Sequence, residues 1–160
     1  MTNPLTASEI RGWFTDIQNG DKTFGELMQQ HVDENVEWTV TCPGDGPLGK
    51  TTPIAGVYHS REAFSKSTMG PGGLFSKLTE GIKVKEVIDV LVQPSQCSNP
   101  SECHLTKAVV EWHGTGTIKK TGKGWDNYYA WVFHFNNESK KAVRVRAYLD
   151  SAAVNLAFEE

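Results

Sequence analysis

Apolar and polar residues alternate most clearly along the last third of the chain. Every second residue of 127–135 is aromatic apart from Asn127 itself, which is the spacing of a strand with one buried face. A second alternating run, at 143–149, follows the turn-forming residues 136–139. The two runs predict a long hairpin. An aromatic face with so few polar groups is typical of the wall of a ligand pocket.

Capping sequences followed by helical spacing predict three helices in the first half of the chain. A capping box that begins at Thr6 precedes a helix over about residues 7–18. Residues 23–26 repeat this pattern before a shorter second helix, which we expect to pack beside the first. Ser60 caps a third helix, which ends at about Met69 because glycines and a proline follow.

The remaining alternating segments predict three further strands, at about 36–40, 82–92 and 108–112. The second of these strands contains an irregularity near Glu86. The glycine- and proline-rich stretch 42–56 predicts a loop. Because helices come first and a strand meander follows, this order predicts an α+β fold in which helices cover one face of a curved antiparallel sheet.

Length and charge restrict the class of protein. A chain of 160 residues fits one domain, which buries roughly 70% of its unfolded surface. The formal net charge of -3 gives no general attraction for nucleic acid or for an anionic membrane, and neither is expected as a partner. No apolar run approaches ~20 residues and no signal-peptide pattern is present, so we expect a cytoplasmic protein.

The three cysteines, Cys42, Cys97 and Cys103, cannot all pair within one chain, and they do not match a zinc spacing. We therefore expect free thiols and no metal site. The alternative is that Cys97 and Cys103 close the loop between them in an oxidising setting.

Two polar residues interrupt the aromatic face of the predicted hairpin. Asn127 and Tyr129 carry an amide and a phenol, which can orient a carbonyl or hydroxyl group and stabilise negative charge. The alternative is that they satisfy backbone groups at the end of the strand. His59, beside the glycine- and proline-rich loop, is a candidate general base at neutral pH or a solvated loop histidine.

Glu111 and His113 also have the composition of an acid–base pair, but they alternate with Val110 and Trp112. Because the apolar residues should face the core, we expect Glu111 and His113 on the outer face of the sheet. That face would then be free to form a two-fold homodimer with polar and charged contacts.

Three short motifs support a resemblance to a known family over nearly the whole chain. These are Gly56-x-Tyr58 before the third helix, Asn127-x-Tyr129, and the closing Tyr148-Leu149-Asp150. With the order of the elements, they resemble the SnoaL-like branch of the nuclear-transport-factor-like superfamily, which includes ketosteroid isomerase, polyketide cyclases and limonene epoxide hydrolase. The resemblance implies one SnoaL-like domain over residues 1–160, shaped as a cone around an apolar cavity.

We expect this cavity to bind an apolar small molecule. The residues expected to line it, besides the polar ones above, are Trp13, Trp38, Val40, Tyr58, Phe64, Val110, Trp112, Trp131, Phe133, Ala147 and Leu149.

The catalytic residues of the isomerase are missing at the matching positions. Trp13 stands at the place of its oxyanion tyrosine, and Trp131 at the place of its second acid. Its general base matches Thr39 or Val40, depending on the register of that strand. Isomerase chemistry by that route is therefore not expected.

The epoxide hydrolase site is missing as well. Its arginine and its two aspartates match Gly114, Gly116 and Ala147. The same alignment places both glycines on the concave face of the sheet, where the loss of side chains would enlarge the cavity.

We therefore predict an enzyme that acts without a cofactor on a polyketide-, terpenoid- or steroid-like compound, by isomerisation, cyclisation, dehydration or ring opening. Tyr129 and Asn127 would be its polar anchors and His59 its base. The first alternative is a binding protein that uses the cavity without turnover; a carboxylate or histidine facing the cavity would favour the enzyme. The second is a protein-interaction module, which predicts a filled core and an exposed apolar patch.

Overall fold

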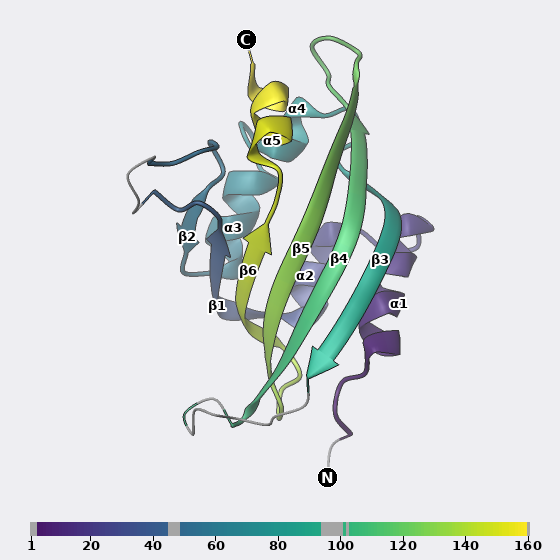
Figure 1. Ribbon diagram of the computed structural model, residues 1–160, viewed down its shortest axis with the longest axis vertical. Coiled ribbons are helices and arrows are strands. Elements are labelled where there is room, and N and C mark those ends of the chain that lie inside the picture. Colours follow the sequence, from purple (N-terminus) through teal and green to yellow (C-terminus); the bar gives the residue numbers. More distant parts are fainter. Residues whose placement is uncertain (1–2, 45–48, 94–100, 102, 160) are drawn as a thin grey trace.

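A computed structural model describes residues 3–44, 49–93, 101 and 103–159. Within these ranges, six strands form one curved sheet, and helices lie on one side of it (Figure 1). The strands are β1 (Val32–Val40), β2 (Gly56–Tyr58), β3 (Lys83–Gln93), β4 (Leu105–Thr117), β5 (Gly124–Asn136) and β6 (Ala142–Tyr148). The helices are α1 (Ala7–Gln18), α2 (Phe24–His31), α3 (Arg61–Thr68), α4 (Leu74–Lys77) and α5 (Ser151–Phe158). The α+β prediction is confirmed.

The order of the strands across the sheet is β2-β1-β6-β5-β4-β3. Neighbouring strands run antiparallel except for β1 and β6, which are parallel. This parallel pair is a departure from the fully antiparallel sheet expected from the sequence. It arises because the chain passes through β2, α3 and the long strands before β6 returns beside β1.

Side-chain caps fix the helix starts as the sequence predicts. The hydroxyl of Thr6 accepts a hydrogen bond from the Glu9 amide at 3.1 Å, and the Glu9 carboxylate accepts one from the Thr6 amide at 2.8 Å. The hydroxyls of Thr23 and Ser60 each accept a hydrogen bond from a backbone amide in the first turn of α2 and α3. Trp13 of α1 stacks on His31 of α2, with ring centroids 3.8 Å apart, so the two helices are in contact as expected.

Helix α4 was not predicted, because glycines and a proline precede it. At Gly73 a β-carbon would lie 2.5 Å from the carbonyl oxygen of Ser67, so only glycine allows the chain to pass this close to α3. The turn brings Leu74 and Phe75 against the sheet side of the helix layer, where both line the pocket described below.

The long strands alternate as predicted. On β5 the residues from Asn127 to Phe135 at every second position are buried, whereas Tyr128 is 60% exposed on the opposite face. On β4 Val110 and Trp112 are buried, and Glu111 is exposed on the outer face. The predicted irregularity of β3 is also present, as two shifts of register against β4.

His113 lies on the outer face with Glu111, but it is buried rather than exposed. Its Nε2 atom lies 2.6 Å from a carboxylate oxygen of Asp126, and its ring stacks on Tyr128 at 4.2 Å between centroids. The two contacts come from the neighbouring strand β5, which covers the imidazole.

The cysteine expectation is wrong for Cys103, which is disulfide-bonded, while Cys42 is an exposed free thiol. Cys97 and most of the loop around it lie outside the described residues. In the described part of the chain no helix has the length and apolar character needed to cross a membrane, and no cluster of three or more metal-binding side chains occurs.

Candidate functional site

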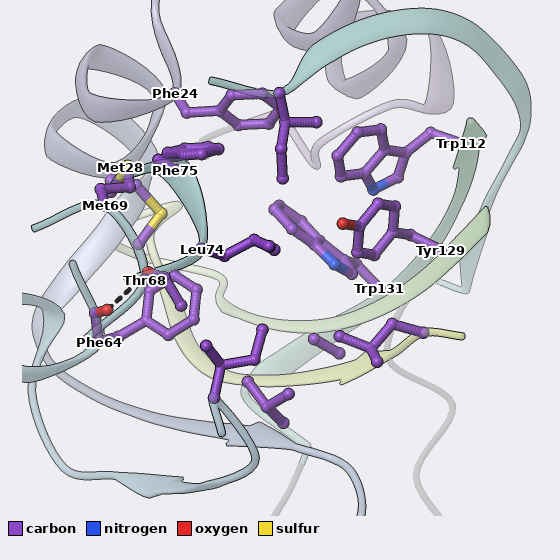
Figure 2. A pocket seen from close by; sticks show the side chains of 15 residues that line it. Phe24, Met28, Phe64, Thr68, Met69, Leu74, Phe75, Trp112, Tyr129 and Trp131 are labelled. Atoms are coloured by element: carbon purple, nitrogen blue, oxygen red, sulfur yellow. Dashed lines mark hydrogen bonds between the residues drawn. The ribbon is translucent and has the colours of Figure 1, made fainter. Parts of the chain in front are cut away.

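An apolar pocket lies between the concave face of the sheet and the helices α2, α3 and α4 (Figure 2). Its volume is about 50 Å³. The residues that line it are Phe24, Met28, Val40, Ile54, Phe64, Thr68, Met69, Leu74, Phe75, Ile82, Trp112, Tyr129, Trp131, Ala147 and Leu149.

Strand residues from the sequence analysis supply most of the sheet side of this pocket. Val40, and not Thr39, lines it, which settles the register of that strand. The other lining residues that the sequence suggested are Phe64, Trp112, Tyr129, Trp131, Ala147 and Leu149. Alternation brings the strand residues among them to one face, because inward positions on paired strands lie side by side, whereas Phe64 comes from α3.

Five of the expected wall residues lie elsewhere, in addition to Asn127 and His59, which are described below. The ring of Trp13 stacks on that of His31 and does not line the pocket. Trp38 lies behind the pocket wall, stacked on Phe64 with 3.9 Å between ring centroids. Tyr58 donates a hydrogen bond to the Ile54 carbonyl at 2.6 Å. The remaining two, both fully buried in the core, are Val110 and Phe133.

The helical side of the pocket was largely missed. Phe24 and Met28 had a signal, since both belong to the apolar stripe of the second predicted helix. Ile82 begins the alternating segment predicted as a strand, but it was not assigned to the pocket. Met69 and Phe75 lie in or next to short irregular segments, where no periodic pattern marks the side that faces inward.

Tyr129 is the one ionisable side chain among the described lining residues. It is 6% exposed, and its ring stacks on Trp112 with 4.2 Å between centroids. Burial raises the pKa of the phenol far above the usual range for tyrosine. Tyr129 therefore stays neutral, and its hydroxyl can donate a hydrogen bond but cannot act as a base.

Asn127 lies on the same face of β5 but does not line the pocket. Its amide donates a hydrogen bond to the Asp150 carbonyl at 3.2 Å and accepts one from the Asp150 amide at 2.9 Å. These contacts correspond to the alternative considered for it, a side chain that satisfies backbone groups at the end of a strand.

His59 is exposed on the segment before α3 and is not among the pocket residues. Thr68 lines the pocket, but its hydroxyl donates to the carbonyl of Phe64 at 2.7 Å. No carboxylate or imidazole belongs to the pocket lining within the described ranges.

A second, open groove of about 420 Å³ lies against the pocket. The two share four apolar side chains, Phe24, Met69, Phe75 and Ile82, which therefore form the partition between them. Figure 2 shows Phe24 and Phe75 side by side at one end of the pocket. A ligand that passes from the groove into the pocket has to displace part of this partition.

The glycines of β4 do not enlarge the cavity as expected. A β-carbon on Gly114 would lie 2.9 Å from the ring of Trp112, 3.0 Å from Ile82 and 3.2 Å from the ring of Tyr129. At Gly116 the space is taken by Leu78. The missing side chain of Gly114 thus makes room for the two stacked rings.

We expect Gly114→Ala to lower the free energy of unfolding by about 1–2 kcal/mol, because the new methyl group overpacks the stack. It should also weaken the binding of any pocket ligand, since Trp112 and Tyr129 must shift. Chemical unfolding and ligand titration measure both effects. Gly124→Ala, on the same sheet with no atom within 4 Å of a new β-carbon, is the control. Equal behaviour of the two variants would contradict the assigned role of Gly114.

No family model and no curated protein sequence matches the chain. Solved structures do match it. A nuclear-transport-factor-2-like (NTF2-like) protein from Burkholderia thailandensis has a TM-score of 0.60 at 17% identity, over 98% of this chain and 99% of that one. The chain has the NTF2-like fold.

Two further matches are described by a ligand or an activity. TerC, co-crystallized with polyporic acid, has a TM-score of 0.60 at 14% identity, over 96% of this chain and 97% of its own. An isomerase candidate from Bacillus subtilis has a TM-score of 0.56 at 20% identity, with 95% and 91% covered. These matches confirm the cone-shaped α+β fold that the sequence resemblance implied.

Proposed function

We propose that this protein is an enzyme that acts without a cofactor on an apolar small molecule held in the pocket, such as a polyketide-, terpenoid- or steroid-like compound. The observation that carries the proposal is the hydroxyl of Tyr129, which is buried in an apolar pocket and meets no acceptor among the described residues. A buried hydroxyl without a partner costs about 1–3 kcal/mol. A ligand oxygen that accepts a hydrogen bond from the Tyr129 hydroxyl would explain why this hydroxyl is buried without a partner in the protein.

The chemistry that fits this site is an isomerisation, cyclisation, dehydration or ring opening in which a substrate oxygen gains negative charge. Tyr129 would stabilise that charge with a hydrogen bond whose geometry is fixed before the reaction, because its ring is held by Trp112. The apolar walls would hold the substrate in one orientation and exclude water. The described lining holds no base, so a proton that leaves one atom of the substrate would have to be taken up by another atom of the same substrate.

The comparisons support this class of function, but only at the level of the fold. A protein of the same fold was co-crystallized with polyporic acid, and another is an isomerase candidate. Neither similarity assigns a substrate or a residue to this chain.

A panel of polyketide, terpenoid and steroid compounds tests the proposal. Thermal shift identifies the compounds that bind, and mass spectrometry after incubation identifies those that are converted. We expect at least one compound to stabilise the protein and to be turned over in the absence of metal or cofactor. Absence of both effects across the panel would contradict the proposal.

A binding protein without turnover is the second candidate, and one observation favours it: the described pocket lining holds no carboxylate or histidine that could act as a base. Binding of a panel compound that is recovered unchanged would support this candidate over the enzyme. The interaction module predicted a core without a cavity, and the pocket gives it no support.

We also propose that two copies associate through the outer face of the sheet. Tyr128 and Tyr148 are 60% and 46% exposed there, and Arg144 lies 3.8 Å from Glu37 on the same face. Light scattering at tens of micromolar should give the mass of a dimer, since a complex with a Kd of ~1 μM would be mostly formed. Tyr128→Glu should shift the population towards monomer. A monomer at this concentration in the unaltered protein would contradict the proposal.

A further inference from the structure

Three hydrogen-bond donors without a partner belong to side chains that line the pocket. They are the indole Nε1 atoms of Trp112 and Trp131 and the hydroxyl of Tyr129, and none of them finds an acceptor in the described part of the chain. The three side chains are 1%, 7% and 6% exposed, so solvent does not reach them freely. More than nine in ten buried polar groups in proteins are paired, and three exceptions in one pocket require an explanation.

The three donors form one group rather than three separate cases. The rings of Trp112 and Tyr129 stack at 4.2 Å between centroids, and Trp131 lies 5.1 Å from Trp112 and 6.1 Å from Tyr129. Trp112 comes from β4 and the other two come from β5, where Trp112 is paired directly with Tyr129. Figure 2 shows their nitrogen and oxygen atoms on the neighbouring edges of the three rings.

The chemistry of these groups specifies what they can bind. An indole N–H only donates, and no acidic or amide side chain lines the pocket within the described residues. A ligand ammonium would therefore find only the hydroxyl oxygens of Tyr129 and Thr68 as acceptors and would leave both indole N–H groups unpaired, whereas a carbonyl or oxyanion would accept from them. One carbonyl oxygen has two lone pairs in its plane, so three donors exceed what one such oxygen accepts well.

We propose that Trp112, Trp131 and Tyr129 form a three-donor site that receives two neighbouring acceptor oxygens of an apolar ligand, as in a 1,3-dicarbonyl compound or its enolate. The inference rests on the proposed function, because it names the class of ligand for the same pocket. Hydrogen bonds to an enolate are stronger than those to a neutral ketone, so the three donors would offset part of the cost of burying the charge of an enolate.

Three ligands with one carbon skeleton test the donor site. Indane, 1-indanone and 1,3-indandione carry no, one and two carbonyl oxygens, and their dissociation constants can be measured by titration calorimetry. We expect affinity to rise about tenfold with each oxygen, which corresponds to one additional net hydrogen bond of ~1.4 kcal/mol. Because all three share the bicyclic body, the ratio of their affinities isolates the contribution of the oxygens from that of the apolar walls.

Variants that lack one donor show which residues cause the preference for 1,3-indandione over indane. Trp112→Phe, Trp131→Phe and Tyr129→Phe should each lower the ratio of indandione to indane affinity by about tenfold. Trp38→Phe is the matched control: its indole nitrogen is also unpaired and buried, but it does not line the pocket, so the ratio should stay unchanged. With ligand labelled with carbon-13 at its carbonyl carbons, the carbonyl resonance should move downfield on binding and less so in each donor variant.

The outcomes separate this inference from the proposed function. If none of the three compounds binds, the donor site is overturned, and the panel of polyketide, terpenoid and steroid compounds decides the proposed function. If indane and 1,3-indandione bind equally, the apolar pocket stands and the donor site is overturned. If 1-indanone binds as tightly as 1,3-indandione, or if all three variants keep the preference, the two-oxygen assignment is wrong. Should a variant fail to fold, the affinity series and the carbonyl shift in the unaltered protein decide.

Discussion

Tyr129→Phe is expected to slow turnover about a hundredfold and, at the same time, to make the folded protein more stable. Loss of one fixed donor to a developing oxyanion costs roughly 3 kcal/mol of transition-state stabilisation. The same change removes a buried hydroxyl that has no acceptor among the described residues, which should raise the free energy of unfolding by about 1 kcal/mol. Steady-state kinetics with a compound from the panel and urea unfolding measure the two effects.

Tyr58→Phe provides the matched control, since it deletes the same atom at a tyrosine whose hydroxyl is satisfied. That hydroxyl donates to the Ile54 carbonyl at 2.6 Å and lies 2.9 Å from the hydroxyl of Ser67. Its loss should lower stability by about 1 kcal/mol and leave turnover unchanged. Full activity in Tyr129→Phe, or a loss of stability equal to that of Tyr58→Phe, would contradict the role assigned to Tyr129.

The opposite signs of the two Tyr129 effects follow from a conflict between folding and function. A protein selected for stability alone would carry phenylalanine at this position, because the ring supplies all of the packing against Trp112. Side-chain groups that lower the free energy of unfolding but bind a ligand are expected at functional sites.

Local sequence signals were sufficient for most elements of the fold. The capping box at Thr6 depends on residues three apart, and the alternation of β5 depends on residues two apart, so both can be seen without knowing the fold. Strand β2 has three residues and α4 has four, too few to show a period. The parallel pairing of β1 with β6 joins residues more than a hundred positions apart, such as Trp38 with Val145, and no local pattern encodes it.

The candidate site was predictable in part, for the same reason. Alternation indicates that Trp112, Tyr129 and Trp131 face inward, and the structure places all three in the pocket. It cannot indicate whether their polar atoms find acceptors, because that depends on the helix layer packed against them. Asn127 shows this limit: it shares a face with Tyr129, yet its amide is bound to Asp150, which is 23 residues away in the chain.

Asn127→Leu is expected to lower the free energy of unfolding by about 3 kcal/mol, which corresponds to a fall of roughly 6–12 °C in Tm. Leucine keeps the approximate volume but leaves the amide and carbonyl of Asp150 without their side-chain partner, at the residue that caps α5. Turnover per folded molecule should be unchanged, because Asn127 does not line the pocket. Thermal unfolding and kinetics at a temperature well below both transitions separate the two quantities.

Asn155→Ala is the matched control for this change, since Asn155 also donates to a backbone carbonyl, that of Thr51 at 2.9 Å, but from an exposed position. Water replaces that bond, so its loss should cost no more than about 0.5 kcal/mol. A folded Asn127→Leu protein that loses turnover would assign Asn127 to catalysis after all. A loss of stability as small as that of Asn155→Ala would show that the contact with Asp150 does not hold the end of β5 to α5.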